Sequence, residues 1–231
     1  MLKTVNRNFI FALLLCLIGG ALDAYSFLYN DGMFCLIQTG NLIRVIISLV
    51  DSSFLLAGYS FMLFFSFLIA LFLINILNRI IKNKNYEYVC LVLVALFLII
   101  PFSTNFDLEN IFNYQNILSG ISLSIVGAII YETFKEKNGI PFSSTMITAN
   151  SRRMTENLVD GIYEKNKDKR KKALFYFFFI ISFALGVLIV ALLHRYIYEF
   201  SKYILFPIIY LAIILMFLIL IFEKKKKSLK S

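Results

Sequence analysis

The sequence predicts an all-α integral membrane protein with six transmembrane helices and both termini in the cytoplasm. Of its 231 residues, 60% are hydrophobic and only 16% are charged, whereas soluble domains are about half apolar and about a quarter charged. The mean hydropathy is +0.80. Six apolar runs reach or approach the roughly 20 residues that cross a bilayer. Basic residues also alternate between the connections as they do in membrane topologies.

The six apolar runs cover residues 9–29, 54–77, 88–102, 115–134, 173–193 and 203–222. Of the 23 Lys and Arg residues, 20 fall in the two tails and in the second and fourth connections. The positive-inside rule places that basic side in the cytoplasm. A missed or invented helix would scramble the alternation, so the charge pattern independently supports six spans.

A polar pattern occurs once in each half of the chain, at an offset of 109 residues. In both copies a carboxylate is followed sixteen positions later by Thr-small-Asn-x-x-Arg. Each copy also has a Gly-containing turn after the carboxylate, Asn30-Asp31-Gly32 in the first and Asn138-Gly139-Ile140-Pro141 in the second. The paired residues are Asp23 with Glu132, Thr39 with Thr148, Asn41 with Asn150, and Arg44 with Arg153.

Three helices per copy make the second copy inverted in the membrane relative to the first. We therefore expect a 3+3 inverted-topology repeat, an arrangement found in many transporters with the ligand path between the halves. Residues 1–102 form the first three-helix repeat, with an outer polar loop at 30–53. Residues 115–222 form the second, with a cytoplasmic loop at 135–172, and residues 223–231 form a basic cytoplasmic tail.

Three short motifs, Gly20-x-x-Asp23-Ala24, Gln38-Thr39-Gly40-Asn41 and Thr145-x-x-Thr148, resemble those of the YoaK-like bacterial membrane proteins. The resemblance covers nearly the whole chain. It implies a six-helix protein of the bacterial cytoplasmic membrane and implies no activity, because that family has no known function. The family tends to have Gln-Asn near Tyr131-Glu132 and Thr-Gly at Thr148-Ala149, so this chain departs from it in the second half.

The two carboxylates have competing interpretations. An ionisable residue inside a membrane helix marks a functional site by default, so Asp23 is a candidate solute ligand or proton carrier. Alternatively it is a helix-end carboxylate that bonds the turn at 38–41 or pairs with Arg44. For Glu132 the competing interpretation is an interfacial ion pair with basic neighbours at helix spacing, such as Lys135.

The Thr-x-Asn segments predict either a ligand site or simple packing. A short helix beginning at Asn41 would present free N–H groups and a positive dipole end, with Arg44 on its first turn, which suits an anion. Helix capping and small-residue packing explain the same residue types without a ligand. After the second copy, Met154, Leu158 and Ile162 form a narrow apolar stripe, which predicts a surface-lying amphipathic helix or one wedged between its neighbours.

Juxtamembrane basic runs account for the net charge of +9 without a nucleic-acid partner. Such runs meet anionic lipid at about 1 kcal/mol per charge. The runs are Lys165, Lys167, Lys169, Arg170, Lys171 and Lys172, and Lys224, Lys225, Lys226 and Lys227. The three cysteines form neither a disulfide framework nor a metal-ligand spacing, and no motif indicates a cofactor or a catalytic group.

We favour a small-solute transporter or channel, of unknown substrate, with its path between the repeats. A chain of 231 residues is small for alternating access, which is consistent with a homodimer. The alternatives are a membrane-embedded enzyme acting on a lipid or lipid-linked substrate, ranked lower for want of a nucleophile–base pair, and a non-catalytic scaffold. The candidate binding residues are Asp23, Gln38, Thr39, Asn41, Arg44, Glu132, Thr145, Thr148, Asn150 and Arg153.

Overall fold

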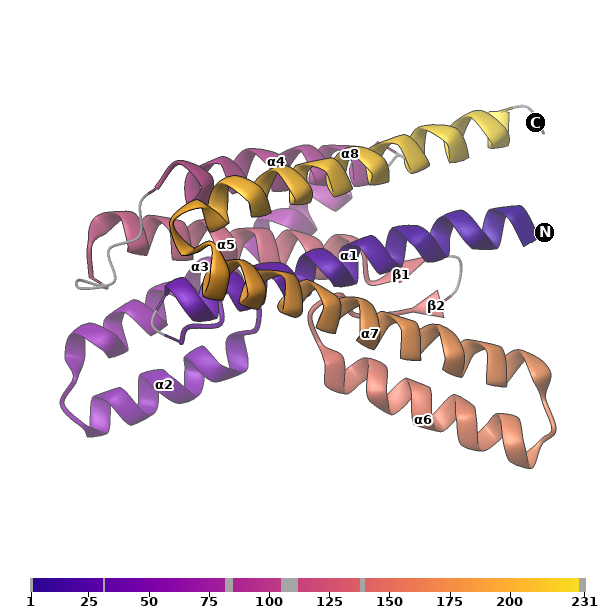
Figure 1. Ribbon diagram of the computed structural model, residues 1–231, viewed down its shortest axis with the longest axis horizontal. Helices are drawn as coiled ribbons and strands as arrows, with labels where there is room; N and C mark the ends of the chain where they lie inside the picture. The colour runs from indigo at the N-terminus through magenta and orange to yellow at the C-terminus, as the bar shows by residue number, and fades with distance from the viewer. Residues whose placement is uncertain (1, 31, 82–84, 105–111, 138–139, 229–231) are drawn as a thin grey trace.

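The computed structural model describes residues 2–30, 32–81, 85–104, 112–137 and 140–228. These residues form eight α-helices, a short 3-10 helix and one two-stranded antiparallel hairpin (Figure 1). The elements are α1 (Leu2–Tyr29), α2 (Gln38–Val50), α3 (Phe54–Ile80), α4 (Tyr86–Ser103), α5 (Tyr114–Thr133), β1 (Glu136–Lys137), β2 (Ile140–Pro141), α6 (Ile147–Tyr163), α7 (Lys167–Tyr196), η1 (Tyr198–Phe200) and α8 (Ser201–Ser228).

Within the described residues, six helices are long and apolar enough to cross a membrane. They match the six predicted runs in order and nearly in extent, which confirms an all-helical protein with six candidate spans. Helices such as α3 are apolar on almost every face, as expected where lipid rather than water surrounds the protein. The spans are Arg7–Tyr29, Phe54–Ile80, Tyr86–Ser103, Tyr114–Thr133, Lys167–Tyr196 and Ser201–Phe222.

The two halves repeat one order of elements. A long helix (α1 or α5) leads through a connection to a shorter helix (α2 or α6), and two long helices follow. Each shorter helix folds back on the next one, α2 on α3 and α6 on α7, and the two hairpins diverge from the centre of the molecule (Figure 1). The first long helix of each half packs on the other half, α1 on α7 and α5 on α3. The first long helix of each half therefore lies against the other half rather than against its own shorter helix.

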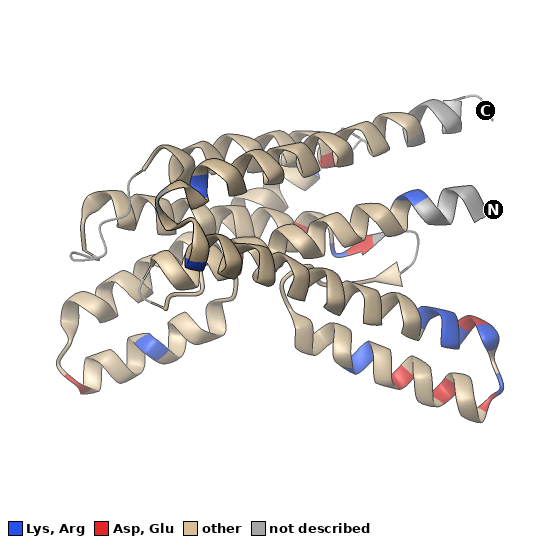
Figure 2. Ribbon diagram, viewed as in Figure 1, with Lys and Arg blue, Asp and Glu red and all other residues tan. Residues whose placement is uncertain are grey.

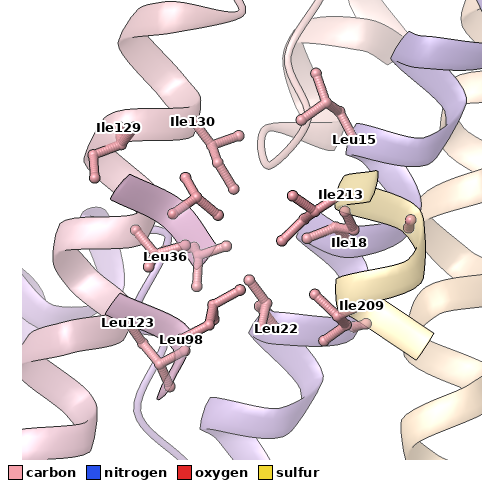
Figure 3. Packing of buried hydrophobic residues seen from close by; sticks show 14 of the residues in the cluster. Leu15, Ile18, Leu22, Leu36, Leu98, Leu123, Ile129, Ile130, Ile209 and Ile213 are labelled. Atoms are coloured by element: carbon pink, nitrogen blue, oxygen red, sulfur yellow. The ribbon is translucent and has the colours of Figure 1, made fainter. Parts of the chain in front are cut away.

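Parts of the connections before α2 and α6 are buried within the bundle, including Leu36 in the first and Ser144 in the second. Leu36 packs on α5 so closely that a Cβ added at Gly127 would lie 2.9 Å from its Cα. The carbonyl of Ser144 packs on Gly19, near the middle of the α1 span, closely enough to exclude a Cβ there. Irregular backbone thus lies within the depth of the spans. Figure 3 shows Leu36 inside the main apolar cluster.

Glycines also bring α1 and α7 into close contact. A Cβ at Gly20 would collide with the carbonyl of Phe183, and one at Gly186 would collide with the carbonyl of Leu17. Small residues are the usual means of close helix approach inside a membrane, where the hydrophobic effect does not drive helices together.

The shorter helices differ in detail from the prediction. Helix α2 begins at Gln38, so Asn41 lies inside its first turn rather than at its start. Of the predicted apolar stripe of α6, Met154 packs against the main apolar cluster, whereas Leu158 is 44% exposed and Ile162 is 60% exposed. The closest contact of α6 with α7 is made by Gly161, where an added Cβ would lie 2.6 Å from Cγ of Arg170. The small and polar side of α6 is buried, since it permits the closer helix contact.

Charged side chains are sparse along the spans and gather where α6 meets α7, at the same end of the bundle as both termini (Figures 1 and 2). Within that basic run Lys169 bonds Asp160 at 2.9 Å and Glu164 at 2.7 Å. The side chains of the run at 224–227, and the predicted turn at 138–139, lie outside the described residues. The first predicted turn has Gly32 at φ 69°, a conformation that favours glycine.

Candidate functional site

A cavity of about 800 Å³ lies where the two halves meet. Its walls come from the C-terminal part of α1, the connections before α2 and α6, the starts of these two helices, and α7. Four of the ten predicted site residues line it. The lining comprises Asp23, Ala24, Phe27, Leu28, Phe34, Ile37, Thr39, Thr145, Met146, Ile147, Thr148, Ala149, Arg152, Phe183, Val187 and Ala191.

Asp23 is the one carboxylate among these lining residues, and it is only 3% exposed. Neither of its oxygens has a hydrogen-bond partner in the described part of the chain. The nearest backbone donor is that of Leu36, which lies close to the carboxylate without meeting the geometric criteria of a hydrogen bond. Asp23 therefore neither bonds the turn at 38–41 nor pairs with Arg44. A buried carboxylate without a partner is expensive inside a membrane protein.

Both shorter helices begin beside the cavity. Their N-cap residues, Ile37 and Met146, line it and make no side-chain cap bond. The first N–H groups of a helix have no partner within the helix, and they form the positive end of its dipole. The cavity thus adjoins two partially positive helix ends, with the hydroxyls of Thr39 and Thr148 on their first turns and the buried Thr145 just before α6.

Gln38 and Asn41 bond the chain that precedes α2. The side-chain amide of Gln38 donates to the carbonyl of Cys35 at 2.6 Å. The amide of Asn41 donates to the carbonyl of Phe34 at 2.8 Å and to Oε1 of Gln38 at 2.9 Å. Irregular backbone at membrane depth requires such internal partners. Neither side chain lines the cavity.

Asn150 repeats this arrangement in the second half. Its amide donates to the carbonyl of Ser143 at 2.6 Å, and its Oδ1 accepts the Ser143 N–H at 3.0 Å. Asn41 and Asn150 therefore each bond the carbonyl seven residues earlier, at positions that correspond in the two copies. The asparagines of the repeated pattern hold the buried connections in shape, which agrees with the packing interpretation of these residues.

The three other predicted residues lie away from the cavity lining. Glu132 forms the ion pair with Lys135 expected from helix spacing, at 2.6 Å. The guanidinium of Arg44 lies next to Gly32. Arg153 lies near Tyr176 of α7, and its buried Nη1 has no partner in the described chain.

The cavity also contains one charged residue that the prediction missed. Arg152 lines it and bonds Oε1 of Glu156 at 2.7 Å. The available signal was its position one helical turn after Thr148, which puts both residues on one face of α6.

The lining suits the binding of a small solute better than it suits covalent chemistry. One carboxylate, one guanidinium and three threonines are set among apolar side chains, and no His or Cys occurs among the described lining residues. Elsewhere in the described part of the chain, no three His, Cys, Asp or Glu side chains lie close enough together to hold a metal ion.

A family model for a protein of unknown function, DUF1275, matches residues 11–218. No curated protein and no solved structure matches the chain significantly. These comparisons do not include the YoaK-like name, so that resemblance stays a prediction. The match extends from the first span into the last, and it includes every residue of the cavity lining. The chain therefore belongs to the DUF1275 family, which is described as a family of unknown function.

Proposed function

We propose that this protein is a small-solute transporter or channel of the bacterial cytoplasmic membrane. The observation that carries this proposal is the cavity with walls from both halves of the chain, next to the N-termini of two shorter helices. Binding sites of membrane transporters lie at the interface between repeats, where the N-termini of interrupted helices face the solute.

The inverted repeat is part of this proposal and is supported by the equivalent contacts of the two halves. Helix α1 packs on α7 as α5 packs on α3, and each shorter helix pairs with the long helix that follows it. The bonds of Asn41 and Asn150 to the carbonyls of Phe34 and Ser143 also correspond. Helix α2 has 13 residues, or about 20 Å at 1.5 Å per residue, so it would cross only part of a bilayer about 30 Å thick.

A transporter explains Asp23 better than the two alternatives do. An enzyme would need a nucleophile with a base to activate it, and the lining residues do not offer that pair. A scaffold would give no reason to keep a carboxylate 3% exposed with neither oxygen bonded. A solute that supplies the missing partner gives such a reason.

Cysteine labelling tests the path. Thr39 and Thr148 line the cavity from α2 and α6. The native cysteines Cys16, Cys35 and Cys90 are all buried, so the unaltered chain serves as the background control. We expect Thr39→Cys and Thr148→Cys each to react with a membrane-impermeant thiol reagent in right-side-out and in inside-out vesicles.

Leu73→Cys is the control for reagent that enters lipid, because Leu73 lies on α3 within a span and is 56% exposed. It should stay unlabelled from both sides. Labelling of Thr39→Cys and Thr148→Cys from one and the same side only would refute a path across the membrane and leave an enzyme or a scaffold.

A further inference from the structure

We infer that the cavity binds a zwitterionic solute with an apolar body, in the class of aliphatic and aromatic amino acids. Its ammonium group would lie on Asp23 and its carboxylate at the N-terminus of α6. This inference rests on the proposed function, because it names the substrate class of the same cavity. It is carried by one buried unpartnered carboxylate, one uncapped helix start and the apolar walls between them.

The carboxylate of Asp23 favours a cationic ligand, because the one guanidinium of the lining, Arg152, bonds Glu156 instead. It lines the cavity, is 3% exposed, and has neither oxygen bonded within the described chain. A hard metal ion such as Ca²⁺ takes six to eight oxygen ligands, and the described lining offers one carboxylate and a few threonine hydroxyls. An ammonium group needs fewer partners and carries its own hydrogen-bond donors, so it fits Asp23 better.

The N-terminus of α6 favours an anionic partner. Met146, Ile147, Thr148 and Ala149 all line the cavity, and Met146 caps the helix without a side-chain bond. Such a helix start binds carboxylates through its free N–H groups and its dipole. In this site the Thr148 hydroxyl would add a further donor.

The protein itself does not supply that anion. In the first copy, the carboxylate of Asp23 lies near the backbone of Leu36, just before α2. The corresponding carboxylate of the second copy, Glu132, is instead paired with Lys135 at 2.6 Å and does not line the cavity. The partially positive N-termini of α2 and α6 therefore have only one carboxylate of the lining between them, that of Asp23. Because Asp23 lies near the start of α2, the N-terminus of α6 is the one that a ligand's carboxylate can occupy.

The spacing of the two groups suits an α-amino acid. Gly19 of α1 contacts Ser144, just before α6, and Asp23 lies one helical turn further along α1, a rise of about 6 Å. An α-amino acid can span such a separation, because each of its charged groups also adds a hydrogen bond of about 3 Å to its partner. Phe27, Phe34 and Phe183 provide apolar wall for its side chain, and the volume is in the usual range for small-molecule sites.

The test compares ligands that carry both charges with ligands that carry one. Full-length protein in lipid nanodiscs is titrated calorimetrically with L-leucine, L-phenylalanine, phenethylamine and 3-phenylpropionate. We expect at least one of the two amino acids to bind about tenfold or more tightly than both single-charge compounds, because each lost charged contact leaves a buried group unpaired. If phenethylamine binds as tightly as the amino acids, the ligand carboxylate has no role and the site at the N-terminus of α6 is wrong. If 3-phenylpropionate binds as tightly, the ammonium group has no role and the assignment of Asp23 is wrong. Absence of binding by both amino acids would overturn the substrate class.

Variants of the two corresponding carboxylates provide the matched control. Asp23→Asn should weaken amino-acid binding about tenfold or more, whereas Glu132→Gln should leave it unchanged. The opposite pattern would overturn the assignment. If Asp23→Asn fails to fold, the comparison of ligands on the unaltered chain still decides.

Failure of this inference is distinguishable from failure of the proposed function. If neither amino acid binds while Thr39→Cys and Thr148→Cys are labelled from both sides, the path stands and the substrate class is wrong. If an amino acid binds but labelling occurs from one side only, the site stands and transport is wrong.

Discussion

Asn41 and Asn150 show how one residue type shapes irregular backbone inside a membrane protein. Both amides are buried, at 1% and 0% exposure, and both bond a carbonyl of the connection before a shorter helix. Water is absent at membrane depth, so each of these carbonyls needs a partner from the protein. The repeated asparagine is thus explained by the fold before any ligand is considered.

Replacing either asparagine should therefore destabilise the protein. We expect Asn41→Ala and Asn150→Ala each to lower the free energy of unfolding by about 1–3 kcal/mol, because each removes the hydrogen bond from a buried amide to a carbonyl of the connection. Asn75→Ala is the matched control, since that exposed amide donates to Leu71 of its own helix at 2.9 Å. Thermal unfolding in nanodiscs measures all three, and equal midpoints would contradict this account.

Asp23, in contrast to the two asparagines, is a polar residue that the fold does not explain. Its type and its place in an apolar run were enough to nominate it, because a membrane rarely tolerates such a residue without a function. The alternative partners proposed from sequence, Arg44 and the turn at 38–41, do not bond it in the structure. What remains is an unpartnered carboxylate that faces a cavity.

At the scale of elements, the contact between α1 and α7 depends on residues without side chains. Gly20 and Gly186 each meet a backbone carbonyl of the opposite helix. Backbone cannot rotate away as a flexible side chain can, so the helices must separate to accept a methyl group. This contact also sets two walls of the cavity, because α1 contributes Asp23 and α7 contributes Phe183.

Gly20→Ala should consequently lower stability by about 1–3 kcal/mol, the usual result of overpacking. Gly58→Ala is the control on α3, where an added Cβ would meet nothing within 4 Å. That control should be neutral or should stabilise the helix by up to about 1 kcal/mol, through helix propensity. Thermal unfolding again provides the measurement. A loss at Gly58 as large as that at Gly20 would show that helix packing is not the cause.

At the scale of the whole molecule, the proposed topology places the tips of the two divergent hairpins on opposite sides of the membrane. The tip between α6 and α7 lies at the same end of the bundle as both termini, and the tip between α2 and α3 lies at the other end (Figure 1). Charged residues gather at the tip between α6 and α7 (Figure 2), which is typical of a cytoplasmic face.

Single cysteines at the two tips test this arrangement. Asp51 and Glu164 are both exposed and follow directly after α2 and α6. We expect an impermeant thiol reagent to label Asp51→Cys only from outside the cell and Glu164→Cys only from the cytoplasmic side. Labelling of both variants from one side would refute the inverted arrangement. Labelling of Asp51→Cys only from the cytoplasmic side and of Glu164→Cys only from outside would mean that the protein has the opposite orientation in the membrane.

The sequence by itself determined the number of spans, their order and the presence of a shorter helix at each Thr-x-Asn pattern. These properties depend on hydropathy within windows of about 20 residues and on local turn chemistry. Gly32, at φ 69°, is an example, because the turn at Asn30-Asp31-Gly32 was recognisable from its residue types alone.

Only the tertiary structure decided which polar residues face the cavity. Thr39, Thr148 and Arg152 face it, while Asn41 and Asn150 bond the buried connections. Sequence spacing does not separate these sets, because all five lie near the starts of two similar helices. Their roles depend on the packing of α1 against α7, two helices that are more than 100 residues apart in the sequence. That packing depends on glycines at the contact, which the hydropathy pattern does not reveal.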